Sequence, residues 1–219
     1  PAVYIPTANH LHSVIKFWVA GEACRPLAED RRSGAHELLL STPQSVDALL
    51  RGQVLALKRQ FSGPVVIILL ADFVMFLAGM RNRFLDTSNG WIVVCVVGIS
   101  TFVADLYTLA WVGMWLGLTA RKVNWAATGA LARVIGLPCL AFCAFVTASV
   151  FTNSERYQAG DPGDLAMGAW FIIGMLNDLF FFTWARANLR NEFRTVVTQR
   201  FDAKIRGRWW AAAPEQPTA

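Results

Sequence analysis

Ser62–Met80 has the sequence SGPVVIILLADFVMFLAGM, an apolar run with one charged side chain, Asp72. A helix that spans a membrane needs about 20 mostly apolar residues, because each residue advances the helix by only about 1.5 Å. A surface helix of a soluble protein would instead carry polar residues along one face. Three more segments meet the spanning requirement. The sequence therefore predicts an all-α integral membrane protein with transmembrane helices at about 62–80, 91–119, 126–151 and 166–185.

The overall composition agrees with this assignment. Of the 219 residues, 55% are hydrophobic and only 16% are charged, which is too apolar for an ordinary soluble domain. The net charge of +5 comes from Lys and Arg at the ends of the apolar runs and in the C-terminal tail, so nucleic acid is not an expected partner. The four cysteines form no CxxC pair, and no metal site is expected.

The distribution of basic residues predicts the orientation, because loops rich in Lys and Arg stay in the cytoplasm. Basic residues gather before the first predicted span, at Arg121 and Lys122, and after the fourth span. The loop 152–165 carries three acids and one arginine, and it is expected outside, as is the loop 81–90 by alternation. We therefore expect both termini to be cytoplasmic in a multi-pass protein of the inner (plasma) membrane.

Three regions follow from this pattern: a cytoplasmic helical segment at 1–61, the transmembrane domain at 62–185 and a cytoplasmic tail at 186–219. Residues 11–33 are predicted to be helical, but the apolar stretch Val14–Ala20 is too short to span and could be the inner end of an earlier helix. Two amphipathic helices are expected at the membrane surface. One carries Val46, Leu49, Leu50, Leu57 and Phe61 and ends at Gly63 and Pro64; the basic tail helix carries Leu189, Phe193, Val196, Val197, Phe201, Ile205 and Trp209.

The segment Glu29–Pro43, EDRRSGAHELLLSTP, suggests a function. A charged helix end, a glycine break and a short leucine-rich helix below the membrane suit docking into a groove of a soluble partner. The segment resembles the cytoplasmic loop of type-2 ABC exporter permeases, and the resemblance extends to the order of the spans that follow. The matching residues are Arg32, Gly34, Glu37, Leu38, Leu39, Leu40, Thr42 and Pro43.

This resemblance implies that the segment is a coupling helix that rests on an ABC ATP-binding subunit, with a second permease copy or a homologue completing the transporter. In the family the loop follows the second of six spans, so we expect the first two spans to be missing or supplied by another chain. His36 departs from the family pattern. No GxxxxGK[ST] phosphate loop occurs, so ATP and Mg²⁺ are expected on the partner, and this chain is expected to have no cofactor and no catalytic residues.

Four charged residues lie within the predicted spans: Asp72, Asp105, Arg133 and Asp178. Charged groups in a bilayer are costly and usually face protein or water. Arg133 and Asp178 lie at similar depths by the helical rise, so the sequence predicts an ion pair between them. Asp105 has no partner at its depth except Asp72.

Two smaller patterns can also be interpreted. Gly113 and Gly117 form a GxxxG sequence, which permits close approach of another helix. His10 and His12 have no third ligand nearby, so a solvated position is expected for both rather than a metal site.

Two other functions fit the same sequence. A polytopic membrane enzyme acting on lipids would use Asp72, Asp105 and Asp178 as acids and bases. A structural membrane protein would need none of them for chemistry. The acids are scattered in depth without an accompanying nucleophile, which favours the permease of an ABC exporter.

Overall fold

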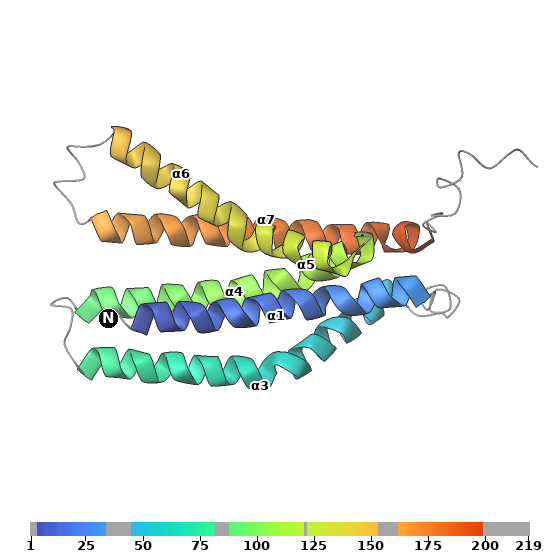
Figure 1. Cartoon of the computed structure of the whole chain (residues 1–219), viewed down its shortest axis with the longest axis horizontal. Helices are drawn as coiled ribbons and strands as arrows, with labels where there is room; N and C mark the ends of the chain where they lie inside the picture. The colour runs from blue at the N-terminus through green and yellow to red at the C-terminus, as the bar shows by residue number, and fades with distance from the viewer. Residues whose placement is uncertain (1–3, 34–44, 82–87, 121, 153–161, 199–219) are drawn as a thin grey trace, which may run out of the picture.

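The computed structural model describes residues 4–33, 45–81, 88–120, 122–152 and 162–198. The described chain is helical throughout, which confirms the predicted all-α class (Figure 1). Its helices are α1 (Tyr4–Ser33), α3 (Val46–Arg81), α4 (Ser88–Thr119), α5 (Val123–Leu131), the π-helical turn η1 (Ala132–Gly136), α6 (Leu137–Thr152) and α7 (Pro162–Thr198).

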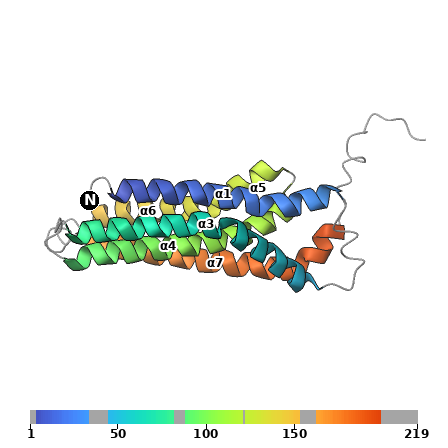
Figure 2. The same cartoon turned by 90° about the horizontal axis from the view of Figure 1, so that it is seen from below.

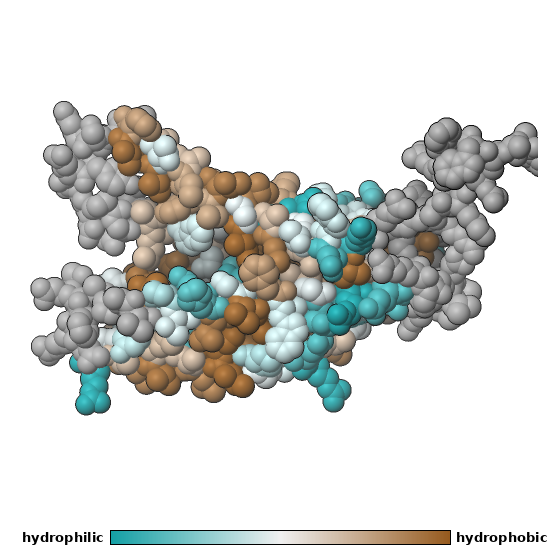
Figure 3. Space-filling model, viewed as in Figure 1, coloured by the Kyte–Doolittle hydropathy of each residue, from teal (hydrophilic) through white to brown (hydrophobic). Residues whose placement is uncertain are grey.

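Four of these helical stretches are long and apolar enough to cross a membrane, as predicted: Val46–Arg81, Gly90–Thr119, Val123–Phe151 and Ala166–Val197. Large apolar side chains on them point outward, among them Ile67, Leu70 and Phe180. Figure 3 shows hydrophobic residues exposed over much of the middle of the molecule. Water would not tolerate so much exposed apolar surface, whereas lipid would. The chain is a multi-pass membrane protein.

Helix α4 is the centre of the bundle, with contacts to α1, α3, α5 and α7. Helix α1 runs along α4 in the same direction, because Tyr4 contacts Trp91 near one end and Cys24 meets Gly117 near the other. Both views show α1 lying lengthwise on the bundle rather than projecting from it (Figures 1 and 2). The helix predicted for 11–33 is therefore confirmed, and it begins earlier, at Tyr4.

The amphipathic helix predicted before the first span does form, but it is continuous with that span in α3. The helix bends in its first half, and Pro64 lies inside it (Figure 1). A proline removes one intrahelical hydrogen bond and can kink a helix without ending it. Leu50, Leu57 and Phe61 are buried in the protein core rather than facing lipid, and Phe61 meets Trp18 of α1 edge to face at 5.5 Å.

The predicted tail helix likewise continues the fourth span, since α7 runs without a break to Thr198. Leu189, Phe193 and Val197, which were expected to face the membrane surface, are buried in the core of this chain. Arg190 of α7 donates to Asp47 of α3 at 3.0 Å, which ties the ends of these helices together. The remaining stripe residues, Phe201, Ile205 and Trp209, lie outside the described residues.

The third span contains a π-helical turn, η1, next to Pro138. The amide of Leu137 donates to Ala132 O rather than to Arg133 O, and Pro138 has no N–H to replace it. The Arg133 carbonyl is satisfied instead by Asn177 of α7, whose Nδ2 donates to it at 3.2 Å. A carbonyl freed inside a membrane helix needs such a partner.

Replacing Asn177 by leucine should therefore destabilise the protein by about 1–3 kcal/mol, the cost of leaving a buried carbonyl without a donor. Thr183→Val is the matched control on the same helix, because the Thr183 hydroxyl donates only to carbonyls of its own helix and is exposed. Thermal unfolding of the two detergent-purified variants measures the difference. Equal unfolding temperatures for the Asn177→Leu and Thr183→Val variants would show that Asn177 does not stabilise the π turn.

Candidate functional site

Helix α1 places two basic side chains inside the bundle. The first is His12, whose Nε2 donates to Asp72 Oδ2 on α3 at 2.8 Å. Its ring stacks on Phe102 of α4 at a centroid distance of 4.1 Å. His12 and Asp72 are each only 7% exposed. The expectation of a solvated His12 is therefore wrong, and this residue joins α1 to α3.

The second basic side chain is Lys16, four residues further along and hence on the same face of α1. Its ammonium donates to Asp105 Oδ2 on α4 at 2.5 Å. Asp105 is buried, and the Lys16 side chain is 16% exposed. Asp72 and Asp105 thus have separate basic partners, both on α1, and do not pair with each other.

Asp178 of α7 is the third buried acid, with 3% of its surface exposed. Among the described residues, neither of its carboxylate oxygens has a hydrogen-bond partner. Its backbone carbonyl accepts from Thr108 of α4 at 3.4 Å, and its carboxyl interacts electrostatically with Asp105 and Lys16. We call His12, Lys16, Asp72, Asp105 and Asp178 the polar cluster. It joins α1, α3, α4 and α7.

The predicted ion pair between Arg133 and Asp178 is wrong. The Arg133 guanidinium donates to Gly129 O of its own helix at 2.9 Å instead. Similar depth along two helices does not place two side chains on facing surfaces, and the π turn at Arg133 changes the helical register there. Arg133 contributes to the contact with α7 through its carbonyl, not through its charge.

Helix α1 carries two basic side chains on its inward face. His12 and Lys16 point into the bundle, whereas Val14, Phe17 and Trp18 are 66%, 60% and 52% exposed. Ile15 and Val19 of the same helix are buried. The outward face suits lipid or another apolar helix, and the inward basic side chains bind acids on neighbouring helices.

Small residues bring α1 and α4 close together, which confirms the role predicted for Gly113 and Gly117. A Cβ atom at Gly113 would lie 2.7 Å from the Cβ of Ala23, and a Cβ atom at Gly117 would overlap the backbone of Cys24. Close approach of these two backbones allows the short reach from Lys16 of α1 to Asp105 of α4.

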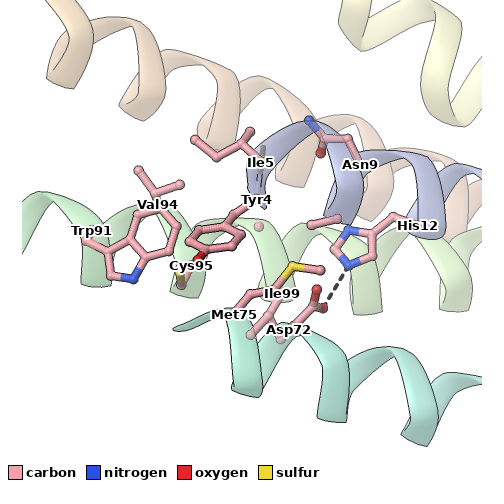
Figure 4. A pocket seen from close by; sticks show the side chains of 12 residues that line it. Tyr4, Ile5, Asn9, His12, Asp72, Met75, Trp91, Val94, Cys95 and Ile99 are labelled. Carbon is pink, nitrogen blue, oxygen red and sulfur yellow. Dashed lines mark hydrogen bonds and ion pairs between the residues drawn. The ribbon is translucent and has the colours of Figure 1, made fainter. Parts of the chain in front are cut away.

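A cavity of about 80 Å³ lies beside the polar cluster, between α1, α3 and α4 (Figure 4). His12 and Asp72 line one part of it, and the rings of Tyr4 and Trp91 line another. The Trp91 indole N–H is already used, since it donates to Phe76 O at 3.2 Å. The thiol of Cys95 also lines the cavity.

The residues matched to the coupling loop lie almost entirely outside the described part of the chain. Residues 34–44 are not described, and Arg32 lies in the last turn of α1 with its side chain outside the description. Their chain neighbours are placed: α1 ends at Ser33 and α3 begins at Val46. The segment therefore joins two helices that both contribute to the polar cluster.

The described residues contain no group of three or more His, Cys, Asp or Glu side chains able to hold a metal ion. The fold and the polar cluster define the class of this protein as a helical, multi-pass membrane protein with charged groups paired inside its bundle. Comparisons with protein-family models, curated proteins and solved structures gave no match in any of the three.

Proposed function

We propose that this chain is the permease subunit of an ATP-driven exporter of the type-2 ABC class, with ATP hydrolysed by a separate subunit. The observation that carries the proposal is the place of residues 34–44, which link α1 to α3. Those two helices meet at the His12–Asp72 hydrogen bond inside the bundle. A partner that moved this link would act, through α1 and α3, on buried polar residues.

The proposed coupling runs along α1. Arg32, Gly34 and Glu37 hold the link on the ATP-binding subunit, Leu38–Leu40 fill a groove on it, and Thr42 and Pro43 begin the return into α3. Lys16 lies 17 residues before Ser33, or about 25 Å along a continuous helix. Because α1 stays helical through Pro26, displacement of its end would shift His12 and Lys16 against their acids.

The same proposal gives an orientation in the plasma membrane. The ends of α1 and α7 and the start of α3 face the cytoplasm, in keeping with their basic residues. Since α1 runs parallel to α4, its first residues lie at the opposite membrane face, beside Trp91. This orientation replaces the expectation that the chain before α3 is entirely cytoplasmic, and it makes α1 the spanning helix that leads into the coupling loop.

The rival enzyme function is less well supported by the geometry. Asp72 and Asp105 are each engaged by a basic residue of α1 and so are not free to act as acid and base. Two such contacts, which join α1 to α3 and to α4, suit a bundle that rearranges better than a hydrolytic site. Membrane lipids and a second permease copy, or a homologue, would cover the outward apolar faces.

Affinity purification of the tagged chain from its own cells tests this proposal. We expect an ABC ATP-binding subunit to co-purify, with ATPase activity, and Leu39→Asp to reduce the recovered activity at least tenfold because a charge in the docking groove is costly. Leu55→Asp is the matched control, an exposed leucine near the start of α3. Absence of such a subunit, or undiminished association of the Leu39→Asp variant, would contradict the proposal.

A further inference from the structure

The cavity beside His12 and Asp72 has the chemistry of a ligand site. Its walls come from α1, α3 and α4 and are largely apolar, with Met75, Val94 and Ile99 among them (Figure 4). A volume of about 80 Å³ is well above the roughly 10–15 Å³ that a cavity needs to hold one water molecule, so a small organic molecule can enter it.

The charge of the cavity is set by Asp72. Among the described residues that line it there is no lysine or arginine, and the ammonium of Lys16, one helical turn beyond His12, donates to Asp105 instead. His12 donates to one oxygen of Asp72, and the second oxygen of this carboxylate is available to a ligand.

The aromatic rings of the cavity also favour a cation. Tyr4 and Trp91 lie with their centroids 6.5 Å apart, tilted against each other, and both line the cavity. The indole N–H already donates to Phe76 O, so Trp91 can contact a ligand through its ring but not through a hydrogen bond. Faces of aromatic rings attract cations, and quaternary ammonium groups are often bound in this way.

We infer that this cavity binds a compact organic cation, such as a short-chain ammonium, with its charge toward Asp72 and its carbon atoms against the apolar and aromatic walls. An anion would find the Asp72 carboxylate and no lysine or arginine among the described residues of the lining, and a neutral molecule would gain nothing from the carboxylate's charge. The inference concerns binding by this chain alone. It would survive failure of the ATP-driven function proposed above.

Cys95 provides a reporter inside the cavity. In a Cys24→Ala, Cys139→Ala, Cys143→Ala background it is the one remaining thiol of the chain. Its reaction rates with methanethiosulfonates carrying a trimethylammonium or a sulfonate group are compared in the detergent-purified protein. Each rate is divided by the rate with free 2-mercaptoethanol. Dividing one normalised rate by the other cancels the reactivity of the thiol itself, since both reagents attack the same sulfur.

We expect the normalised rate with the trimethylammonium reagent to exceed that with the sulfonate reagent at least tenfold. Asp72→Asn should bring this ratio of normalised rates to within threefold of 1, the value for the free thiol. Asp47→Asn, at an exposed site, should leave the ratio unchanged. Choline at millimolar concentration should slow labelling at least fivefold, and its neutral isostere 3,3-dimethyl-1-butanol should not.

The experiment remains decisive if Asp72→Asn fails to fold, because the charge preference and the choline protection are measured with Asp72 intact. Equal rates for the two reagents, or a preference for the sulfonate, would overturn the inference. So would equal protection by choline and its neutral isostere.

Discussion

Gly117→Ala is expected to destabilise the protein by about 3 kcal/mol, the upper part of the range for overpacking a tight contact. Its new Cβ atom would overlap the backbone of Cys24, and backbone cannot move aside as a flexible side chain can. Helices α1 and α4 would have to separate, and separation would stretch the contact of Lys16 with Asp105 and the stacking of His12 on Phe102. The loss should therefore extend beyond the glycine itself.

Gly98→Ala is the matched control on the same helix, because a Cβ atom there meets nothing within 4 Å. Alanine is favoured over glycine inside helices by up to about 1 kcal/mol, so this variant should be neutral or more stable. Thermal unfolding followed by size-exclusion chromatography in detergent distinguishes the two variants. If both alanines have the same effect, α1 does not pack tightly on α4.

Lys16→Met should destabilise the protein about as much as Gly117→Ala, but for an electrostatic reason. It would leave Asp105 buried without its cation, and removing one partner of a buried ion pair costs about 3–5 kcal/mol. Lys16→Met combined with Asp105→Leu removes both charges and should restore much of the lost stability. Rescue of this kind would show that the single variant suffers from an uncompensated carboxylate, not from lost packing.

The exposed pair of Arg190 and Asp47 is the control for this prediction. Their side chains are 43% and 51% exposed, so Arg190→Met should cost no more than about 1 kcal/mol. Unfolding free energies from a detergent denaturant series give the comparison. A Lys16→Met variant as stable as Arg190→Met, or a double variant no better than the single, would mean that the Lys16 ion pair does not stabilise the bundle.

The membrane spans could be predicted from the sequence because each one is a long run of mostly apolar residues. An apolar run such as 62–80 has few alternatives once its length approaches the roughly 20 residues that cross a bilayer. The GxxxG pair on α4 was also correctly interpreted, since closely approaching membrane helices commonly use small residues. These features depend on local sequence alone.

The position of α1 could not be predicted in the same way. His12 and Lys16 interrupt its apolar residues and make the helix look too polar to enter the bundle, yet they lie there because Asp72 and Asp105 bind them. The spacing of four residues between them was a usable signal of a shared polar face. Interpreting it required knowing which acids lay opposite.

The Arg133 prediction failed for a related reason. Helical rise gives the depth of a residue, but the direction of its side chain depends on rotation, and a proline-linked π turn changes the rotation locally. Nothing in the sequence near Asn177 indicated that it would satisfy the Arg133 carbonyl. Contacts between helices far apart in the chain decide such details.

The proposed coupling route requires α1 to cross the membrane, and labelling of single cysteines tests this requirement directly. In a background without the four native cysteines, Ile5→Cys at the start of α1 and Ser45→Cys before α3 are exposed to a membrane-impermeant maleimide. We predict that position 5 is labelled in intact cells and that position 45 is labelled only after permeabilisation. Labelling of both positions from the same side would show that α1 does not cross, and would contradict the route from the coupling segment to the polar cluster.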